Sequence, residues 1–321
     1  MKTLRLGTRG SELALFQANA VAGLLGTRAG VTCEIVVIKT SGDRLAEASL
    51  AQIGGKRLFV KEIEDALLAG EIDLAVHSSK DMPALLPDGL HIGAVLARED
   101  PLDAFVLPDS GPVPIAEIES AFTRGPRIGT SSIRRVAQLA RRFPRATFQP
   151  VRGNLGTRLR KLDSGEYDAL VLAAAGLRRL GRTDRITATI PSEICVPAPG
   201  QGIIAVETRD DDAHVRRLVA EVDDSDAAAA LRTERVVVTR LGGGCQMPIG
   251  ALAEISAGQL FVRGVVISPD GARMATGAAT GSVADGERLG AEVAEQLLKD
   301  GAGDILADVQ RAQAAVEGIQ P

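Results

Sequence analysis

Aromatic side chains are scarce in this chain of 321 residues: they make up 2% of it, with no Trp and a single Tyr. Proteins that hold single-stranded nucleic acid stack its bases on aromatic rings, so the composition argues against a large base-stacking surface. The net charge of −4 also argues against nucleic acid as the main partner, because such proteins usually carry a basic binding domain.

Cysteine and histidine are equally rare, with three of each. Cys33, Cys195 and Cys245 form no CxxC pair, which excludes a zinc ribbon, and three is a poor number for a disulfide framework. The histidines are not spaced as metal-ligand pairs are. We therefore expect no metal site and a reducing compartment.

Long apolar runs are absent as well. No stretch approaches the ~18 uncharged apolar residues of a membrane span. Arg5, Arg9 and Glu12 interrupt the first residues, so the opening does not resemble a secretory signal. These features predict a cytoplasmic protein that does not enter membranes.

What is present is an ordinary globular balance, with 45% hydrophobic and 24% charged residues. The length exceeds what one core comfortably fills, so two or three domains are expected. Strand-like and helix-like segments alternate over residues 1–97 and again over 98–197, which predicts two α/β units with mostly parallel sheets. No internal repeat with a fixed period is visible.

A Pro- and Gly-rich linker over residues 196–202 breaks this alternation. The short strand after it can return the chain to the first unit, so that residues 198–219 would join 1–97 in one domain. Residues 220–321 combine a long helix, three short strands and a last amphipathic helix, which predicts a small α+β domain. Residues 310–321 are expected to be a frayed tail.

Positive charge gathers in the second unit. Residues 124–185 hold 15 Lys or Arg against four Asp or Glu, although the whole chain is acidic. A basic lobe in an acidic protein attracts anions. A plain solvated basic face and a nucleic-acid surface are the alternative interpretations.

Two predicted helix starts in this basic unit carry groups that bind anions. The segment Gly129-Thr130-Ser131-Ser132 ends a strand and opens a helix, with Arg134 and Arg135 in its first turn. These two cations oppose the helix dipole, so their role is not to stabilise the helix. Arg152-Gly153-Asn154 repeats the arrangement, with Arg158 one turn on. Two such starts side by side would bind a polyanionic small molecule.

The first unit holds a similar cluster. Ser11 opens the first predicted helix after Arg9 and is either an ordinary N-cap or a ligand group. Lys80 and Asp81 follow the predicted strand over residues 73–77, at the carboxyl end of a parallel strand where α/β proteins usually place their sites. A solvated surface pair is the alternative.

Cys245 lies on a glycine-rich loop, Leu241-Gly-Gly-Gly-Cys-Gln-Met-Pro-Ile-Gly250. A structural cysteine usually sits in an apolar strand, as Cys33 does, whereas a thiol on an exposed loop is a candidate for covalent chemistry. No His is near it in the sequence, so a Cys-His protease is not supported.

Eight segments taken together resemble one family, the porphobilinogen deaminases or hydroxymethylbilane synthases. In chain order they read TRGSELALFQAN, GGKRLFVKEIE, AVHSSKDMP, GTSSIRRVAQL, VRGNLGTRLRKL, AAAGLRRLG, PAPGQG and LGGGCQMPIG, across residues 8–250. The resemblance implies two periplasmic-binding-protein-like lobes plus a small third domain. PAPGQG differs from the PAVGQG expected in the family, which places Pro199 at the crossing between lobes.

The resemblance also implies a chemistry. Family members carry a dipyrromethane cofactor joined by a thioether to the loop cysteine, here Cys245. They join four porphobilinogen molecules head to tail, release ammonia each time, and free linear hydroxymethylbilane by hydrolysis. Each pyrrole bears an acetate and a propionate, so the growing chain is a polyanion that suits a basic cleft. A monomer is implied as well.

Carried over by position, Asp81 would be the catalytic carboxylate that stabilises positive charge as ammonia leaves. Residues implied to bind the cofactor, besides Cys245, are Ser78, Lys80, Thr130, Ser131, Ser132, Arg134, Arg135, Arg152 and Gly153. Residues implied to bind the substrate are Arg9, Ser11, Phe59, Arg152, Arg158 and Arg179.

Two other functions remain open on the sequence alone. One is a non-catalytic two-lobed binding protein for a carboxylated ligand, with Cys245 structural. The other is a nucleic-acid-binding protein that uses the basic lobe. Only the enzyme needs Asp81 and a covalently loaded Cys245 together.

Overall fold

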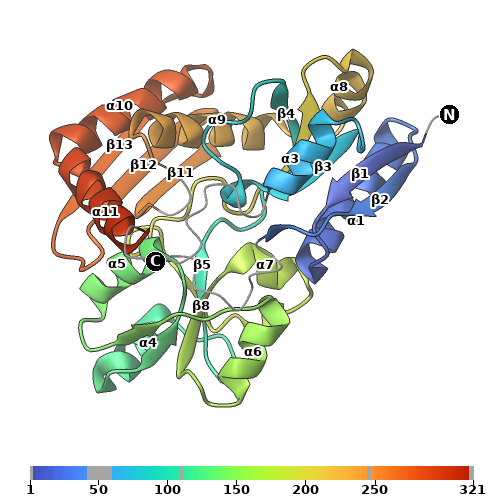
Figure 1. The fold of residues 1–321 in the computed structure, drawn as a ribbon. Coiled ribbons are helices and arrows are strands. Elements are labelled where there is room, and N and C mark those ends of the chain that lie inside the picture. The colour runs from blue at the N-terminus through green and yellow to red at the C-terminus, as the bar shows by residue number, and fades with distance from the viewer. Residues whose placement is uncertain (1–2, 42–59, 109–110, 244–246, 318–321) are drawn as a thin grey trace.

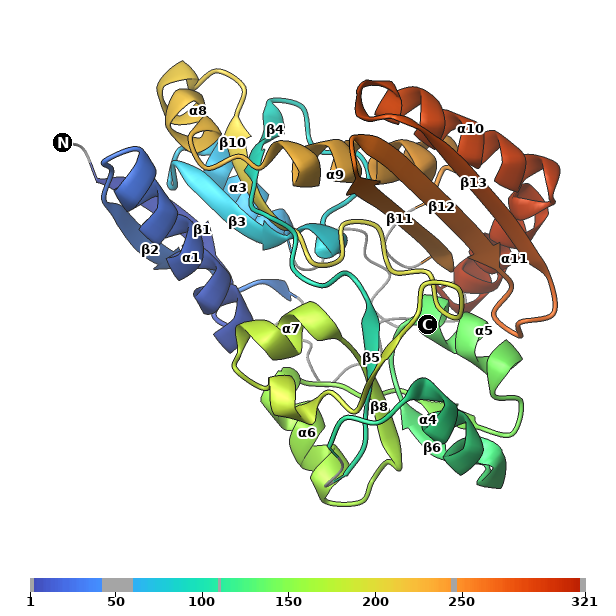
Figure 2. The same ribbon diagram turned by 180° about the vertical axis from the view of Figure 1, so that it is seen from behind.

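The computed structural model describes residues 3–41, 60–108, 111–243 and 247–317. Their strands form two five-stranded sheets and one three-stranded sheet. Figures 1 and 2 show three units: the two five-stranded sheets face each other across the molecule, and the three-stranded sheet with its helices lies beside them.

The first sheet has the order β2-β1-β3-β10-β4, and β10 runs against the other four strands. Its members are β1 (Leu4–Thr8), β2 (Cys33–Val37), β3 (Leu74–Ser78), β4 (Leu90–Val95) and β10 (Ile204–Arg209). Its helices are α1 (Glu12–Arg28), α3 (Lys61–Leu68) and α8 (Ala213–Ala220). The strand after the 196–202 linker therefore does return to this sheet.

The second sheet repeats this plan in the order β7-β6-β8-β5-β9, with β5 reversed. Its strands are β5 (Asp103–Val106), β6 (Arg127–Gly129), β7 (Thr147–Gln149), β8 (Ala169–Ala173) and β9 (Ala188–Ile190). Its helices are α4 (Ile115–Ala121), α5 (Ile133–Arg142), α6 (Leu155–Asp163) and α7 (Ala174–Arg179). The predicted α/β class with mostly parallel sheets is confirmed.

The third unit is an antiparallel meander covered by helices, as predicted for a small α+β unit. It contains α9 (Ser225–Arg240), β11 (Ile249–Ser256), β12 (Gln259–Ile267), β13 (Met274–Ser282), α10 (Gly286–Lys299) and α11 (Ala302–Glu317). The prediction of a frayed tail from residue 310 is wrong up to Glu317. Ile305, Leu306 and Val309 bury their side chains in the core of this unit, which fixes α11 in place.

One side-chain network recurs in both lobes and shows that they share a frame. Arg5 of β1 donates from its backbone N and from Nη2 to the two carboxylate oxygens of Asp73, at 2.8 Å each, and from Nη2 to Gly70 O at 2.8 Å. Arg127 of β6 makes the same three bonds to Asp168 and Gly165, at 2.7, 2.9 and 2.8 Å. The partners are 68 residues apart in one lobe and 41 in the other, so no constant period reveals the repeat.

A buried ion pair joins the two crossing segments to the third unit. Glu234 of α9 is fully buried and accepts from Arg98 Nη1 at 2.6 Å. It also accepts from the backbone N of Gly200 at 2.6 Å and of Ala253 at 2.7 Å. Arg98 and Gly200 lie on the two segments that pass between the lobes, and Ala253 lies on β11. This single carboxylate therefore holds all three units together.

We predict that Glu234→Ala lowers the free energy of unfolding by about 3–5 kcal/mol, because it leaves a buried guanidinium and two backbone N–H groups without their acceptor. Urea unfolding followed by circular dichroism measures the change. Glu292→Ala, which removes an exposed i,i+4 partner of Arg288, is the matched control and should cost about 0.5 kcal/mol or less. Equal losses in the two variants would contradict this account of Glu234.

Candidate functional site

A small cavity lies where β1 and β3 separate. The two strands pair through Leu6–Leu74 and Gly7–Ala75, whereas β1 stays paired with β2 as far as Thr8–Val37. Beyond this point the gap between the strand ends is a cavity of about 70 Å³. Its polar lining residues are Arg9, Ser11, Gln17, His77, Ser78 and Asp81. The cavity lies at the carboxyl ends of two parallel strands, next to the turn that holds Lys80 and Asp81.

Short-range hydrogen bonds shape one wall of this cavity. Ser11 is the N-cap of α1 and accepts from Ala14 N at 3.3 Å, so the ordinary interpretation of Ser11 holds alongside its place in the lining. Gln17 Nε2 donates to Ser78 Oγ at 2.9 Å and so links α1 to the end of β3. Gln17 was not among the residues predicted from the sequence.

Lys80 and Asp81 form the 3₁₀ turn directly after β3 (Ser79–Asp81). Asp81 is exposed, whereas Lys80 is partly buried and donates from Nζ to Gln201 Oε1 at 3.3 Å. Burial lowers the pKa of Lys80 from 10.5 to about 8, and the positive charge of Arg135 contributes to this lowering. An ammonium held in this way attracts a carboxylate strongly, because little water competes for it.

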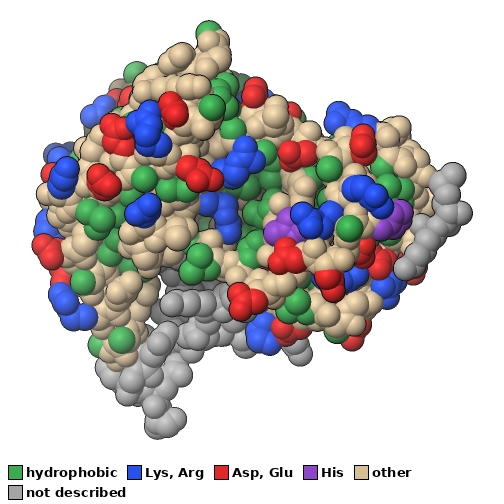
Figure 3. Space-filling model, turned by 90° about the horizontal axis from the view of Figure 1, so that it is seen from above, with side chains coloured by type: hydrophobic (Ala, Val, Ile, Leu, Met, Phe, Trp, Pro, Cys, Tyr) green, Lys and Arg blue, Asp and Glu red, His purple; other side chains and the backbone are tan. Residues whose placement is uncertain are grey.

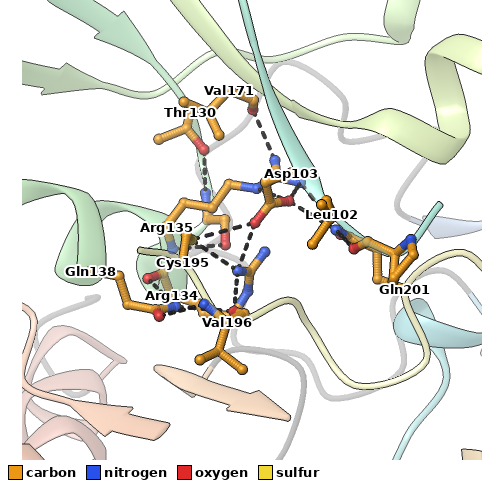
Figure 4. Close-up of polar contacts among 12 residues, drawn as sticks. Leu102, Asp103, Thr130, Arg134, Arg135, Gln138, Val171, Cys195, Val196 and Gln201 are labelled. Atoms are coloured by element: carbon orange, nitrogen blue, oxygen red, sulfur yellow. Dashed lines mark hydrogen bonds and ion pairs between the residues drawn. The ribbon is translucent and has the colours of Figure 1, made fainter. Parts of the chain in front are cut away.

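Arg134 and Arg135, which come from the second lobe, bind one buried carboxylate. Arg134 Nη1 lies 2.8 Å from Asp103 Oδ2, and Arg135 Nη2 lies 2.7 Å from Asp103 Oδ1 (Figure 4). Burial opposes the ionisation of Asp103, but the two guanidinium charges outweigh it and hold its pKa well below its usual range. Asp103 thus explains why two cations occupy the first turn of α5 against the helix dipole.

Gln201 connects this cluster to the first lobe. Its Nε2 donates to Asp103 Oδ1 at 2.9 Å, and its Oε1 accepts from Lys80 Nζ and, at 3.5 Å, from Arg135 Nη2. Neither Asp103 nor Gln201 was predicted from the sequence. The available signals were an acidic residue opening an otherwise apolar strand and a glutamine between two glycines of a crossing segment.

The two predicted helix starts of the second lobe do lie together. Ser131 Oγ donates to Val151 O at 2.8 Å, which joins the loop before α5 to the loop before α6. Ser132 caps α5 and Asn154 caps α6, while Thr130 is buried beside them. Gly153 has a φ of 103° and Arg158 Nε donates to its carbonyl at 2.9 Å, so this loop needs glycine.

Arg158 belongs to the second lobe, and its charge interacts with that of Asp81 in the first lobe. Burial lowers its pKa to about 10, the charge of Arg135 contributes to this lowering, and the carboxylate of Asp81 partly offsets the effect. Arg179 donates from Nη2 to the carbonyl of Gly202 at 2.6 Å. Burial lowers the pKa of Arg179. Arg152 is partly buried close to Arg158.

Phe59 and Cys245 lie outside the described residues. The other two cysteines are described and are poor nucleophiles. Cys195 is fully buried between Arg134 and Asp103, and burial raises the pKa of its thiol to about 12. Burial also raises the pKa of Cys33. A thiolate is the reactive form, so neither thiol is prepared for covalent attachment.

Taken together, the described residues of the two lobes place more cations than carboxylates at their junction. Lys80, Arg134, Arg135 and Arg158 share the negative charge of Asp103 and of Asp81 at the rim. By contrast, the outer face seen in Figure 3 carries basic and acidic side chains side by side. This local excess of cations predicts an anionic ligand between the lobes. Among the described residues there is no group of three metal-binding side chains, and no helix is long and apolar enough to cross a membrane.

Comparisons with known proteins agree with this chemistry. Residues 4–217 match the family model "Porphobilinogen deaminase, dipyromethane cofactor binding domain", and residues 228–299 match "Porphobilinogen deaminase, C-terminal domain". Porphobilinogen deaminases from two strains of Acidithiobacillus ferrooxidans are each 48% identical over 316 residues, which cover 97% of this chain and 99% of theirs. Among solved structures, the VFT2 domain of Bordetella pertussis BvgS aligns at a TM-score of 0.40 and 17% identity, covering 68% of this chain and 86% of that domain.

We predict that Lys80→Met raises the melting temperature of the unliganded chain at pH 7 and that this difference fades as the pH rises from about 8 to 10.5. Below pH 8 the native chain holds a desolvated ammonium that the unfolded chain would solvate. Above pH 8 native Lys80 becomes neutral while the unfolded residue still binds a proton, so the penalty on the native chain shrinks as the pH rises.

 Between pH 8 and 10.5 stability therefore rises with pH, because the unfolded chain binds more protons there than the native chain, and the penalty is gone near pH 10.5.

Thermal melts of Lys80→Met and the wild type over this pH range test the prediction. The exposed Lys299→Met is the control for losing one positive charge. A difference between Lys80→Met and the wild type that stays constant with pH would count against it.

Proposed function

The chain belongs to the porphobilinogen deaminase family, and from this premise we propose that it is a hydroxymethylbilane synthase, a transferase. It joins four porphobilinogen molecules head to tail, releases ammonia at each addition, and hydrolyses off the linear product. The observation that carries the proposal is the group of buried and partly buried cations, Lys80, Arg134, Arg135 and Arg158, that gathers near Asp81 between the lobes. The substrate and product are polycarboxylates, so this arrangement fits them.

The family's dipyrromethane cofactor fits the residues present. Its carboxylates require cations in a site that excludes water, and Lys80, Arg134 and Arg135 are buried or partly buried there. Ser78, Thr130, Ser131, Ser132, Arg152 and Gly153 supply further donors nearby. When bound, the cofactor supplies the primer onto which porphobilinogen is added. The chain's own residues would hold it by charge and hydrogen bonds.

Cys245 is the proposed attachment residue. Burial raises the pKa of the Cys33 and Cys195 thiols, which disfavours the reactive thiolate at both, and the family resemblance assigns the attachment to the cysteine of the glycine loop. Residues 241–250 belong to the part of the chain that matches the C-terminal family model. The third unit would thus anchor the cofactor and the two lobes would grip it.

Asp81 is the proposed catalytic residue. It is exposed at the edge of the cavity, so its carboxylate can reach a pyrrole N–H and offset the positive charge that develops as ammonia leaves. Arg9, Ser11, Phe59, Arg152, Arg158 and Arg179 are proposed to bind substrate side chains. Arg158 supports this most directly, since its charge lies within reach of Asp81.

The domain boundaries and the setting complete the proposal. We propose a first domain of residues 1–97 and 198–219, a second of 98–197 and a third of 220–321, in a cytoplasmic monomer whose partner is porphobilinogen rather than nucleic acid or a membrane. A non-catalytic receptor for a carboxylated ligand would need the cations but neither Asp81 nor a loaded Cys245.

We predict that Asp81→Asn folds normally and turns porphobilinogen over at least ~10²-fold more slowly, because the amide cannot stabilise a developing cation. Ammonia release and product formation measure this. Asp285→Asn, at an exposed carboxylate paired only with Arg288 among described residues, controls for the chemical change. Unchanged turnover in Asp81→Asn would sink the assignment.

We also predict that Cys245→Ser abolishes the covalent adduct, whereas Cys33→Ser and Cys195→Ser retain it. Intact mass before and after incubation with porphobilinogen gives the answer directly. The Cys245→Ser protein should melt at a lower temperature than the loaded chain, because a bound cofactor stabilises the native state. An adduct that persists in Cys245→Ser would refute the attachment.

A further inference from the structure

Within its sheet, the end of β3 that leads to Asp81 pairs with a strand on one side only. Its pairing with β1 stops at Ala75, so residues 76–78 are bonded within the sheet to β10 alone, through Val76–Val206, His77–Ala205 and Ser78–Ile204. Ser79 continues this link by donating from its backbone N to Ile203 O at 3.0 Å. The turn that presents Asp81 comes immediately afterwards. Beside the cavity, the strand that leads to the proposed catalytic residue therefore lacks one of its two neighbouring strands.

A buried ionisable pair joins this stretch of β3 to β10. His77 Nε2 is 3.0 Å from Glu207 Oε2 of β10, and their side chains are 3% and 0% exposed. The other carboxylate oxygen of Glu207 has no hydrogen-bond partner among the described residues. Burying such a pair with one oxygen unsatisfied lowers the stability of the fold. Its presence therefore indicates a role that an apolar pair could not fill.

The second lobe shows the same position without the pair. Ala104 of β5 faces Leu172 of β8 as Ala205 faces His77, and Val106 faces Leu170 as Glu207 faces Ala75. His77 and Glu207 thus correspond to Leu172 and Val106, which are both buried. The fold closes this position well with two aliphatic side chains, so the polar pair of the first lobe is not required by the architecture.

The lobes also differ in the segment after the strand. After β8 the chain enters α7 through Ala174 and Ala175, whereas after β3 it forms the turn with Lys80 and Asp81. The polar pair is therefore found in the lobe whose strand end carries the proposed chemistry. A hydrogen bond is directional, and a buried polar contact can fix one register where aliphatic contacts tolerate several.

We propose that His77 and Glu207 are positioning residues that fasten the end of β3 to β10 and so set the place of Asp81 in the site. This rests on the proposed role of Asp81. The pair acts through the backbone of residues 77–81 and does not touch the reacting atoms. Displacing the Asp81 carboxylate would lower the turnover rate steeply, because the stabilisation of a developing charge depends on close placement.

The test copies the second lobe into the first. The double variant His77→Leu/Glu207→Val should melt no lower than the wild type and should still acquire the adduct. Its kcat should fall at least about tenfold while KM changes about twofold or less, as expected when a group is misplaced for the chemical step. Hydrogen exchange of peptides covering residues 74–82, measured without substrate, should be faster than in the wild type.

A conservative variant and a matched control complete the design. His77→Gln keeps a donor for Glu207 and should restore kcat and slow exchange, whereas a proton-transferring role of the imidazole would not be rescued. His91→Leu removes another histidine–carboxylate contact, between β4 and Asp210, and should leave kcat unchanged. Wild-type kcat and exchange in the double variant, or failure of His77→Gln to rescue, would overturn the proposal. Loss of activity in Asp81→Asn, assayed in parallel, keeps the proposed function separate from this outcome.

Discussion

Burying several cations side by side is the constraint on which this structure depends. Lys80, Arg134 and Arg135 meet at the junction of the lobes, and the fully buried carboxylate among them is Asp103. Isolated buried charges are far too costly to be tolerated, so each guanidinium is bound to Asp103 and to backbone carbonyls. The compensation is incomplete at Lys80, which donates from Nζ to the neutral Gln201 Oε1 and whose pKa is lowered by burial. A site left in this state favours a ligand that brings carboxylates of its own.

The two lobes have the same arrangement of strands but contribute different side chains to the site. The Arg5–Asp73 and Arg127–Asp168 networks place the same strands and turns in each lobe. At the end of β3 the first lobe carries Ser78, Lys80 and Asp81, whereas alanines come after the end of β8 in the second. The second lobe instead presents the hydroxyls and guanidinium groups around α5 and α6. One half thus contributes the acidic group, the other contributes most of the cations, and neither is a complete site.

The local sequence pattern predicted the helix starts and the position of the site, but it could not predict contacts between residues far apart in the sequence. The helices that begin after Ser132 and Asn154 follow from capping residues, and the site at the ends of β1 and β3 follows from strand order. Asp103 was missed because its partners Arg135 and Gln201 lie 32 and 98 residues away, and no local spacing encodes such a contact. The end of α11 was predicted wrongly because polar composition near a terminus does not reveal Ile305 and Val309 docking onto a core. The repeat between lobes escaped notice because the segments between its matching parts differ in length.

The crossing segments couple the site to the arrangement of the lobes. A side chain at Gly200 would meet Ser79 Oγ at 2.5 Å, and one at Gly202 would strike the carbonyl of Glu99, so these positive-φ glycines allow close packing rather than looseness. Gln201 between them holds Lys80 of one lobe and Arg135 of the other. Any shift between the lobes therefore changes the distance between two cations of the site. By the same linkage, a polyanion that binds both cations also favours the lobe arrangement in which they are close. The positive charges of Lys80 and Arg135 are thus the groups through which a bound polyanion stabilises one arrangement of the lobes.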